Sequence, residues 1–95
     1  MKKIRRLIRF HGYVQGVGFR WRAMQAANAA GATGWVRNEE DGSVLMEIQG
    51  TEEQIDSVVQ TIRKSIYIDI RNIKAVTIPV IENERSFEVK DSWWF

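Results

Sequence analysis

Apolar and polar residues alternate along the first segment of the chain. Within residues 4–14, Ile8 and Phe10 fall on one side of an extended chain, and Arg9 and His11 fall on the other. A period of two residues is typical of a β-strand that buries one of its faces. The pattern therefore predicts a first strand over residues 4–14.

The period changes to that of a helix after a glycine-bearing stretch at residues 12–18. Small and aromatic residues then recur at helical spacing, namely Phe19, Ala23, Ala26, Ala27 and Ala30. Gly31 provides a C-terminal stop. The alanines favour a helix but give it a thin apolar stripe, so this helix is expected to approach the sheet closely.

A hairpin is predicted next. Residues 33–38 have the composition of a second strand, and the Glu-Asp-Gly-Ser sequence at 40–43 is a turn signal. In the returning strand, residues 44, 46 and 48 are apolar and alternate with Leu45, Glu47 and Gln49, and Gly50 ends the strand. The two strands are expected to pair antiparallel.

A second helix is predicted from a local start signal. Thr51 is a favourable N-cap, and Gln54, three residues later, completes a capping box. The buried face of this helix is expected to consist of Ile55, Val58, Val59 and Ile62.

The remaining residues give a weaker pattern. Residues 66–70 alternate in a way that fits either a short strand or an apolar loop. A strand over 73–80 is predicted with more support, and Pro79 places it at a sheet edge or at a strand end. A polar turn at 82–85 and a short last strand over 86–90 complete the chain.

The order of these elements predicts the fold. A β-α-β-β-α-β order with a trailing strand indicates an α+β, ferredoxin-like βαββαβ sandwich, with an antiparallel sheet and two helices on one face. A length of 95 residues fits a single domain over residues 1–95. Because many functions use this fold, the fold alone does not determine the chemistry.

Composition excludes several kinds of site and of cellular location. The chain has no cysteine and a single histidine, so disulfides and thiolate catalysis are excluded, and a His-rich metal site or a Ser-His-Asp triad is not expected. Its apolar runs are far shorter than the roughly 20 residues of a membrane span. Arg9 and His11 interrupt the basic start before a signal-type apolar region develops. A cytoplasmic monomer without membrane partner, metal or cofactor is expected.

Charge is distributed unevenly although the net charge is only +2. Seven of the fourteen basic residues and none of the twelve acidic residues lie within residues 1–22, the basic ones being Lys2, Lys3, Arg5, Arg6, Arg9, Arg20 and Arg22. This asymmetry is compatible with an anionic ligand near the first segment and equally with a solvated basic strand face.

The stretch between the first strand and the first helix has the residue types of an anion site. Gly16 and Gly18 permit positive φ, and such a turn can direct consecutive N–H groups into one concavity. The turn leads into a helix N-terminus, where unpaired N–H groups and the helix dipole favour an anion. Arg20 falls in the first helical turn, where a cation is unfavourable unless it meets a negative charge. The alternative is a glycine loop that only turns the chain, with Arg20 paired to a surface carboxylate.

Two motifs in this part of the chain resemble those of a known family. Residues 12–20 read Gly-Tyr-Val-Gln-Gly-Val-Gly-Phe-Arg, which is similar to the acylphosphatase signature Gly-x-Val-Gln-Gly-Val-x-Phe-Arg. Residues 31–38 read Gly-Ala-Thr-Gly-Trp-Val-Arg-Asn and match the second signature, Gly-x-x-Gly-Trp-Val-x-Asn. The resemblance covers about residues 4–64 and, more loosely, 86–89. Residues 65–70 depart from it, because the family often has a Gly-Pro turn there.

The resemblance implies an activity and a role for each matched position. The activity is hydrolysis of the carboxyl–phosphate bond of acyl phosphates, without metal or cofactor. Arg20 would bind the phosphoryl group and Asn38 would orient the attacking water. The backbone N–H groups of the preceding loop would hold the same phosphate oxygens, and these belong to Gln15, Gly16, Val17, Gly18 and Phe19. From the residues alone, Asn38 also fits a turn residue at the end of a strand.

Two other functions remain as alternatives. One is a non-catalytic module that binds an acyl or carbamoyl phosphate for a partner, and the other is a ferredoxin-like nucleic-acid-binding domain. Nucleic-acid binding would need stacking aromatics on the third strand, whereas residues 44–49 contain none and carry an acid. Trp21 and Arg22 fit either contacts with the acyl group or an ordinary helix surface. The aromatic ending Trp93-Trp94-Phe95 fits a lid over the sheet edge or an anchor for a partner or membrane surface.

Overall fold

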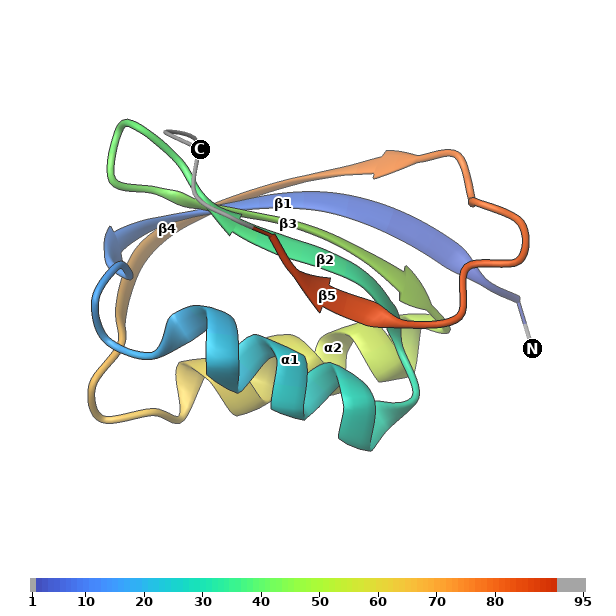
Figure 1. Ribbon diagram of the computed structural model, residues 1–95, viewed down its shortest axis with the longest axis horizontal. Coiled ribbons are helices and arrows are strands. Elements are labelled where there is room, and N and C mark those ends of the chain that lie inside the picture. The colour runs from blue at the N-terminus through green and yellow to red at the C-terminus, as the bar shows by residue number, and fades with distance from the viewer. Residues whose placement is uncertain (1, 91–95) are drawn as a thin grey trace.

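A computed structural model describes residues 2–90 of the chain. Its elements are β1 (Ile4–Tyr13), α1 (Phe19–Ala30), β2 (Thr33–Asn38), β3 (Val44–Gly50), α2 (Glu52–Arg63), β4 (Asp69–Ile78) and β5 (Phe87–Val89). The five strands form one sheet in the order β4-β1-β3-β2-β5, and both helices cover the same face of it (Figure 1). The predicted α+β sandwich is thereby confirmed. The aromatic ending at 93–95 lies outside the described residues.

The core lies between this sheet and the two helices. Strand β1 occupies an inner position, pairing antiparallel with β3 on one side and β4 on the other. Ile8 and Phe10 point from β1 into the core, as the alternation predicted, and are 3% and 0% exposed. The Phe10 ring contacts that of Phe19 at the start of α1, with 4.9 Å between ring centroids. This contact fixes the beginning of α1 against the centre of the sheet.

Helix α1 begins and ends where the sequence predicts, and helix α2 begins where it predicts. Helix α1 is bounded by Gly18 and Gly31, which have φ angles of 80° and 79°. Helix α2 starts with the capping box that was expected from Thr51 and Gln54, whose side chains each hydrogen-bond the backbone N–H of the other. Glycine tolerates the left-handed conformation at a helix end, and the capping box satisfies two N–H groups that a helix start leaves unpaired.

Strand β4 differs from the prediction at both ends. It spans Asp69–Ile78 rather than 73–80, because the pairing with β1 continues beyond a bulge, where Arg71 of β4 is the extra residue opposite His11 and Gly12, as far as Tyr13 and Asp69. Residues 65–68, whose path the sequence left open, therefore form only a short connection. Pro79 follows directly after β4, which is an edge strand, as expected for a residue without a backbone donor.

Strand β5 gives the sheet its one parallel pairing. Its three residues lie alongside β2, and Gly34 pairs with Phe87. Backbone bonds extend the pairing at both ends, from the Gly34 N–H to the Ser86 carbonyl and from the Lys90 N–H to the Val36 carbonyl. The other neighbouring pairs, β1–β3, β1–β4 and β2–β3, are antiparallel, so the sheet is mixed. The last strand thus runs beside the edge of α1.

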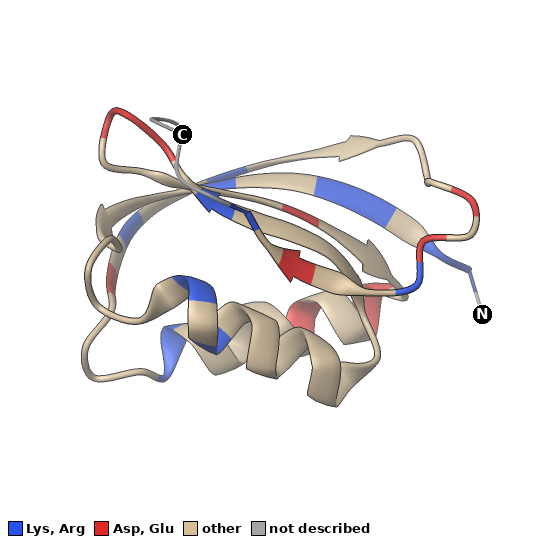
Figure 2. Cartoon of the chain, in the orientation of Figure 1, with Lys and Arg blue, Asp and Glu red and all other residues tan. Residues whose placement is uncertain are grey.

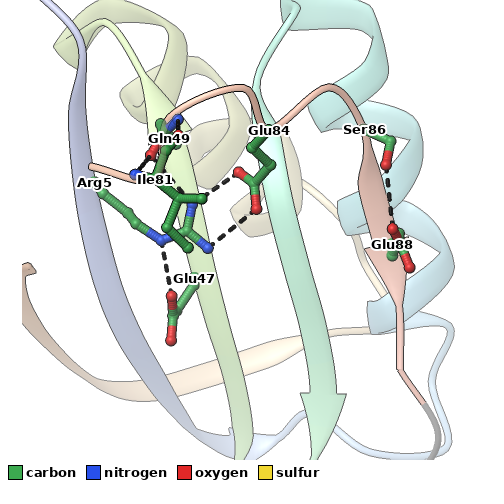
Figure 3. A network of polar contacts seen from close by, with 7 residues as sticks. All are labelled: Arg5, Glu47, Gln49, Ile81, Glu84, Ser86 and Glu88. Carbon is green, nitrogen blue, oxygen red and sulfur yellow. Dashed lines mark hydrogen bonds and ion pairs between the residues drawn. The ribbon is translucent and has the colours of Figure 1, made fainter. Parts of the chain in front are cut away.

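The sheet face opposite the helices holds a buried ionic network at one end (Figure 3). Arg5 is fully buried there, and its guanidinium donates to Glu47 at 2.8 Å and to both carboxylate oxygens of Glu84 at 2.7 and 3.2 Å. Gln49 accepts a further hydrogen bond from Arg5. Its side-chain amide also donates through Nε2 to the carbonyl of Ile81 and accepts through Oε1 from the N–H of Ile81. The network therefore fastens the segment between β4 and β5 over the sheet.

The network also determines how its charged groups ionise. Burial by itself would raise the pKa of Glu84, but the hydrogen bonds and positive charge of Arg5 outweigh it, and the pKa lies below its ordinary value. Burial would likewise lower the pKa of Arg5, yet Glu84 and Glu47 raise it overall. A buried arginine is tolerated here because two carboxylates meet it.

Candidate active site

The loop between β1 and α1 has the backbone conformation that its glycines predict. Gly16 and Gly18 have φ angles of 73° and 80°, and a Cβ added at either position would meet no atom within 4 Å. Glycine is therefore required there by the backbone and not by crowding. Within residues 2–90, the N–H groups of Gly16, Val17 and Gly18 donate no hydrogen bond to another residue. The loop thus presents unpaired donors beside open space.

Helix α1 begins at this loop without a side-chain cap. Gly18 is its N-cap, and its first turn contains no acidic residue. Arg20, the second residue of the helix, is half-buried, and its Nη1 lies 3.5 Å from the carbonyl oxygen of Lys90, just beyond β5. A cationic side chain and the positive end of a helix therefore lie together, an arrangement that favours an anion between them.

Asn38 is the last residue of β2 and is only 7% exposed. Its backbone pairs with Val44 across the hairpin that the sequence predicted. The turn is closed by Asp41, whose carboxylate accepts hydrogen bonds from the hydroxyl and the N–H of Ser43. These two bonds hold the pKa of Asp41 below its ordinary value, and the bond from the Ser43 hydroxyl has the larger effect. The Asn38 side chain forms part of the wall of the pocket described below, where a ligand could reach it.

Gln15 ties the glycine loop to this hairpin. Its side-chain Nε2 donates to the backbone carbonyls of Glu39 at 2.7 Å and of Ser43 at 2.9 Å. Glu39 and Ser43 are themselves joined by a backbone bond of 2.9 Å. One amide group therefore sets the distance between the loop and the strand end that carries Asn38.

The loop, the helix start and the strand end enclose one pocket of about 320 Å³. It is lined by Val14, Gly16, Gly18, Phe19, Arg20, Trp21, Met24, Asn38 and Val89. Of the residues predicted for the site, this pocket brings together Gly16, Gly18, Phe19, Arg20 and Asn38. Gln15 and Val17 do not line it: the Gln15 side chain braces the hairpin, and Val17 packs against the core. Phe19 is 2% exposed, so its side chain belongs to the core as well.

Three lining residues were not predicted from the sequence. Val14 and Met24 lie one on each side of the loop and could have been inferred, because Met24 follows Arg20 by one helical turn and shares its face. Val89 gave no such signal, because only the parallel pairing of β5 brings it to the site. Trp21, for which two explanations were open, lines the pocket and is 61% exposed.

Arg5, Arg6 and Arg9 of the basic first segment each lie close to acidic residues from later parts of the chain; Figure 2 shows how the charged residues are distributed over the elements. Arg5 meets Glu47 and Glu84, Arg6 meets Glu52 at 3.1 Å, and Arg9 lies 3.7 Å from Glu39. The uneven charge of the sequence is thus mostly balanced by later parts of the chain. Among the charged residues described, Arg20 is the one that lines the pocket.

No group of three or more potential metal-ligating side chains occurs within residues 2–90, and no helix in this range is long and apolar enough to cross a membrane.

Comparisons with known proteins agree with this geometry. The acylphosphatase family model matches residues 7–89. An acylphosphatase from Clostridium acetobutylicum is 41% identical over 86 residues, which cover 90% of this chain and 94% of that protein. The crystal structure of the Bacillus subtilis acylphosphatase superposes with a TM-score of 0.84 at 28% identity, covering 92% of this chain and 98% of that one. The fold also matches 12% of the much longer T. kodakarensis HypF, with a TM-score of 0.78 and 28% identity. The chain belongs to the acylphosphatase family.

Proposed function

We propose that this protein hydrolyses acyl phosphates to a carboxylate and inorganic phosphate in the pocket between α1 and the end of β2. The observation that carries the proposal is the convergence of Arg20, the unpaired loop amides and Asn38 on that one pocket. A phosphate-sized anion there would meet a guanidinium, a helix N-terminus and a row of N–H donors. Family membership supports the same activity.

Arg20 and the loop amides have one task in this proposal, which is to hold the phosphoryl group. Phosphoryl transfer places charge on three equatorial oxygens, and catalysis depends mainly on positioning and on neutralising that charge. The planar guanidinium of Arg20 can meet two of the oxygens at once. The N–H groups of Gly16, Val17, Gly18 and Phe19 would donate to the others. Because these donors are fixed by the fold, they need little reorganisation when charge develops.

Asn38 has the second task, which is to hold the attacking water. Its amide can accept from the water and donate to it, and its position at a paired strand end restricts its movement. The water oxygen bonds to phosphorus while the bond from phosphorus to the acyl oxygen breaks. The carboxylate leaves with the bonding electrons, and the water's protons pass to the phosphate product and to solvent. A carboxylate is a good leaving group, so it needs little help from a general acid.

In this reaction the enzyme needs no metal. The enzyme itself is expected to be monomeric and cytoplasmic. The described residues offer the phosphate a cation and backbone donors, which can neutralise the charge that a bound Mg²⁺ neutralises in other phosphoryl-transfer enzymes. We infer the monomer and the location from composition and length. The oligomeric state can be measured by sedimentation equilibrium.

The test is a hydrolysis assay with acetyl phosphate and benzoyl phosphate, run with and without EDTA. Wild-type protein is expected to turn over both substrates at rates that EDTA leaves unchanged. Arg20→Ala and Asn38→Ala are each expected to lose at least about a hundredfold in kcat/KM. Arg22→Ala, a change of the same kind at a position outside the pocket, serves as the matched control and should retain activity.

Each alternative function has its own outcome in this assay. Wild-type protein that binds phosphate but turns over neither substrate would be a binding module, and the hydrolase proposal would be wrong. Activity that EDTA abolishes and Mg²⁺ restores would contradict the metal-free reaction. Tight binding of single-stranded RNA without turnover would favour the nucleic-acid-binding alternative.

A further inference from the structure

We infer that the pocket beyond the phosphate site is an acyl-binding surface built by Trp21, Met24 and Val89, and that it selects apolar, aromatic-sized acyl groups over charged ones. This inference rests on the proposed function and specifies its substrate class. It concerns the part of the pocket that neither Arg20 nor Asn38 occupies. The first motif shared with the family ends at Arg20 and the second spans residues 31–38, so neither includes Trp21 or Met24.

The pocket wall divides into two chemically distinct parts. One part consists of the loop glycines, Arg20 and Asn38, and it supplies donors for the phosphoryl group. The other part consists of apolar side chains, from Val14, Phe19, Trp21, Met24 and Val89. An acyl phosphate has the same division, with a charged end joined directly to an organic one. A phosphate held on the polar part therefore leaves the acyl group to contact the apolar part.

Helix geometry explains why the two parts adjoin. Trp21 follows Arg20 directly, and Met24 follows Trp21 by three positions, so all three side chains lie on adjoining parts of the first turns of α1. Val89 approaches from β5, which lies beside α1 at the sheet edge. The apolar surface is thus held by two elements that the fold fixes independently of each other.

Exposure indicates that this surface is open to a ligand. Trp21 is 61% exposed and Val89 is 40% exposed, whereas Met24 is half-buried against the core. An indole ring offers a large flat face to an aromatic or branched acyl group. Apolar groups that cover this face would be stabilised in proportion to the area removed from water.

Charge explains the expected discrimination. Among the described residues that line the pocket, Arg20 is the one ionisable group, and it faces the phosphoryl position in the proposed reaction. A carboxylate on the far side of the acyl group would lie against the apolar side chains without a partner. Removing it from water there is unfavourable. An anionic acyl group should therefore react more slowly than a neutral one of the same shape.

The experiment compares kcat/KM for acetyl phosphate, benzoyl phosphate and 4-carboxybenzoyl phosphate. For wild-type protein we expect kcat/KM for benzoyl phosphate to exceed that for acetyl phosphate by about tenfold, because the ring buries additional apolar area. It should also exceed kcat/KM for 4-carboxybenzoyl phosphate by at least about tenfold, because the carboxylate would be left without a partner. Trp21→Ala should lower the benzoyl-to-acetyl ratio by at least about threefold. Trp21→Phe should restore most of that ratio, because it keeps an aromatic face.

Two further measurements separate this inference from the proposed function. Gln25→Ala, on the same helix but outside the pocket, is the matched control and should leave the ratio unchanged. Inhibition by benzoylphosphonate and acetylphosphonate, which cannot be hydrolysed, should show the same preference and the same dependence on Trp21. Equal rates for all three substrates, or a ratio that Trp21→Ala leaves intact, would overturn the acyl surface while leaving the hydrolase standing. No turnover of any substrate would contradict the hydrolase, and the phosphonates would still test the surface.

Discussion

The side-chain amide of Gln15 donates to the backbone carbonyl of Glu39 at 2.7 Å, directly beside Asn38. Gln15 belongs to the loop proposed to hold the phosphate, and Glu39 follows the residue proposed to hold the water. The two halves of the site come from different parts of the chain and are joined through this one side chain. Its role is positioning, since it does not line the pocket.

Gln15→Ala should therefore impair catalysis without removing a group that contacts the substrate. We expect kcat/KM to fall about tenfold, because loss of the brace lets the loop and Asn38 separate. The free energy of unfolding should fall by about 1–2 kcal/mol for the two lost hydrogen bonds. Steady-state kinetics and urea unfolding measure the two effects. Gln60→Ala, at an exposed position of α2, is the control, and an equal kinetic effect there would rule out a specific brace.

Substitutions at Arg20 and at Asn38 should have different effects on the affinity for inorganic phosphate. Arg20→Lys keeps the charge but loses the planar pair of donors, so phosphate affinity should fall at least about tenfold. Asn38→Ala should keep phosphate affinity within about twofold while kcat falls about a hundredfold, because the residue acts on the water. Titration calorimetry and competitive inhibition provide the affinities. Comparable loss of phosphate affinity in both variants would contradict the division of roles.

Gly34→Ala should destabilise the fold strongly. Gly34 has φ of +139°, and a Cβ at this position would lie 1.9 Å from the Glu47 carbonyl oxygen of the neighbouring strand. We expect a loss of at least about 3 kcal/mol, because backbone would have to move. Gly42→Ala is the matched comparison, since it has φ of +89° but no atom within 4 Å. It should cost about 1 kcal/mol in the same unfolding measurement, and equal losses would show that the close approach of β2 to β3 is unimportant.

Glu84 should make stability depend on pH in the acidic range. Its pKa is lower in the folded protein than in the unfolded chain, so its contribution is complete above the unfolded value of about 4.3 and is lost as pH falls through the folded value. Unfolding free energy should therefore fall below about pH 5, and fall less steeply in Glu84→Gln. At pH 7 that variant should be less stable by about 3 kcal/mol, because Arg5 stays buried with a weaker set of partners. Glu82→Gln, at an exposed position, should follow the wild-type curve.

Local chemistry explains which elements could be predicted from the sequence. The bounds of α1 follow from two glycines, a residue type that is favourable at a helix end and unfavourable inside a helix. The start of α2 follows from the capping box of Thr51 and Gln54. The β2–β3 hairpin follows from its turn residues. Each of these signals lies within a few residues of the feature it determines, so one segment of sequence contains the whole cause.

Features that depend on distant partners were predicted poorly or not at all. The start of β4 at Asp69 depends on a bulge in its pairing with β1, and the pairing of β5 with β2 depends on a strand of three residues, too short for its pattern to indicate a partner. Arg5 could be interpreted as part of an anion site or a solvated face, whereas its partner Glu84 lies far along the chain. The position of Val89 in the pocket has the same cause.

The pocket could be predicted in part for the same reason. Its polar half comes from one continuous loop and one strand end, and both are marked by motifs. Arg20 also stands out because a cation at a helix start is unusual. The apolar half combines neighbours on one helix with a residue from the far end of the chain, so only the helical part carries a local signal. The roles of Arg20 and Asn38 in the reaction stay predictions until the variants are measured.

The parallel pairing of β5 with β2 also has a consequence for how the enzyme is assembled. Val89 lines the pocket and the Lys90 carbonyl contacts Arg20, so the site is incomplete until the last described strand has docked. Closing the long chain segment between β2 and β5 carries a large entropic cost, and contacts of this kind slow folding. During synthesis, the hairpin and both helices leave the ribosome before β5 does. Catalytic competence should therefore be acquired late in folding, after the hairpin and both helices have been synthesised.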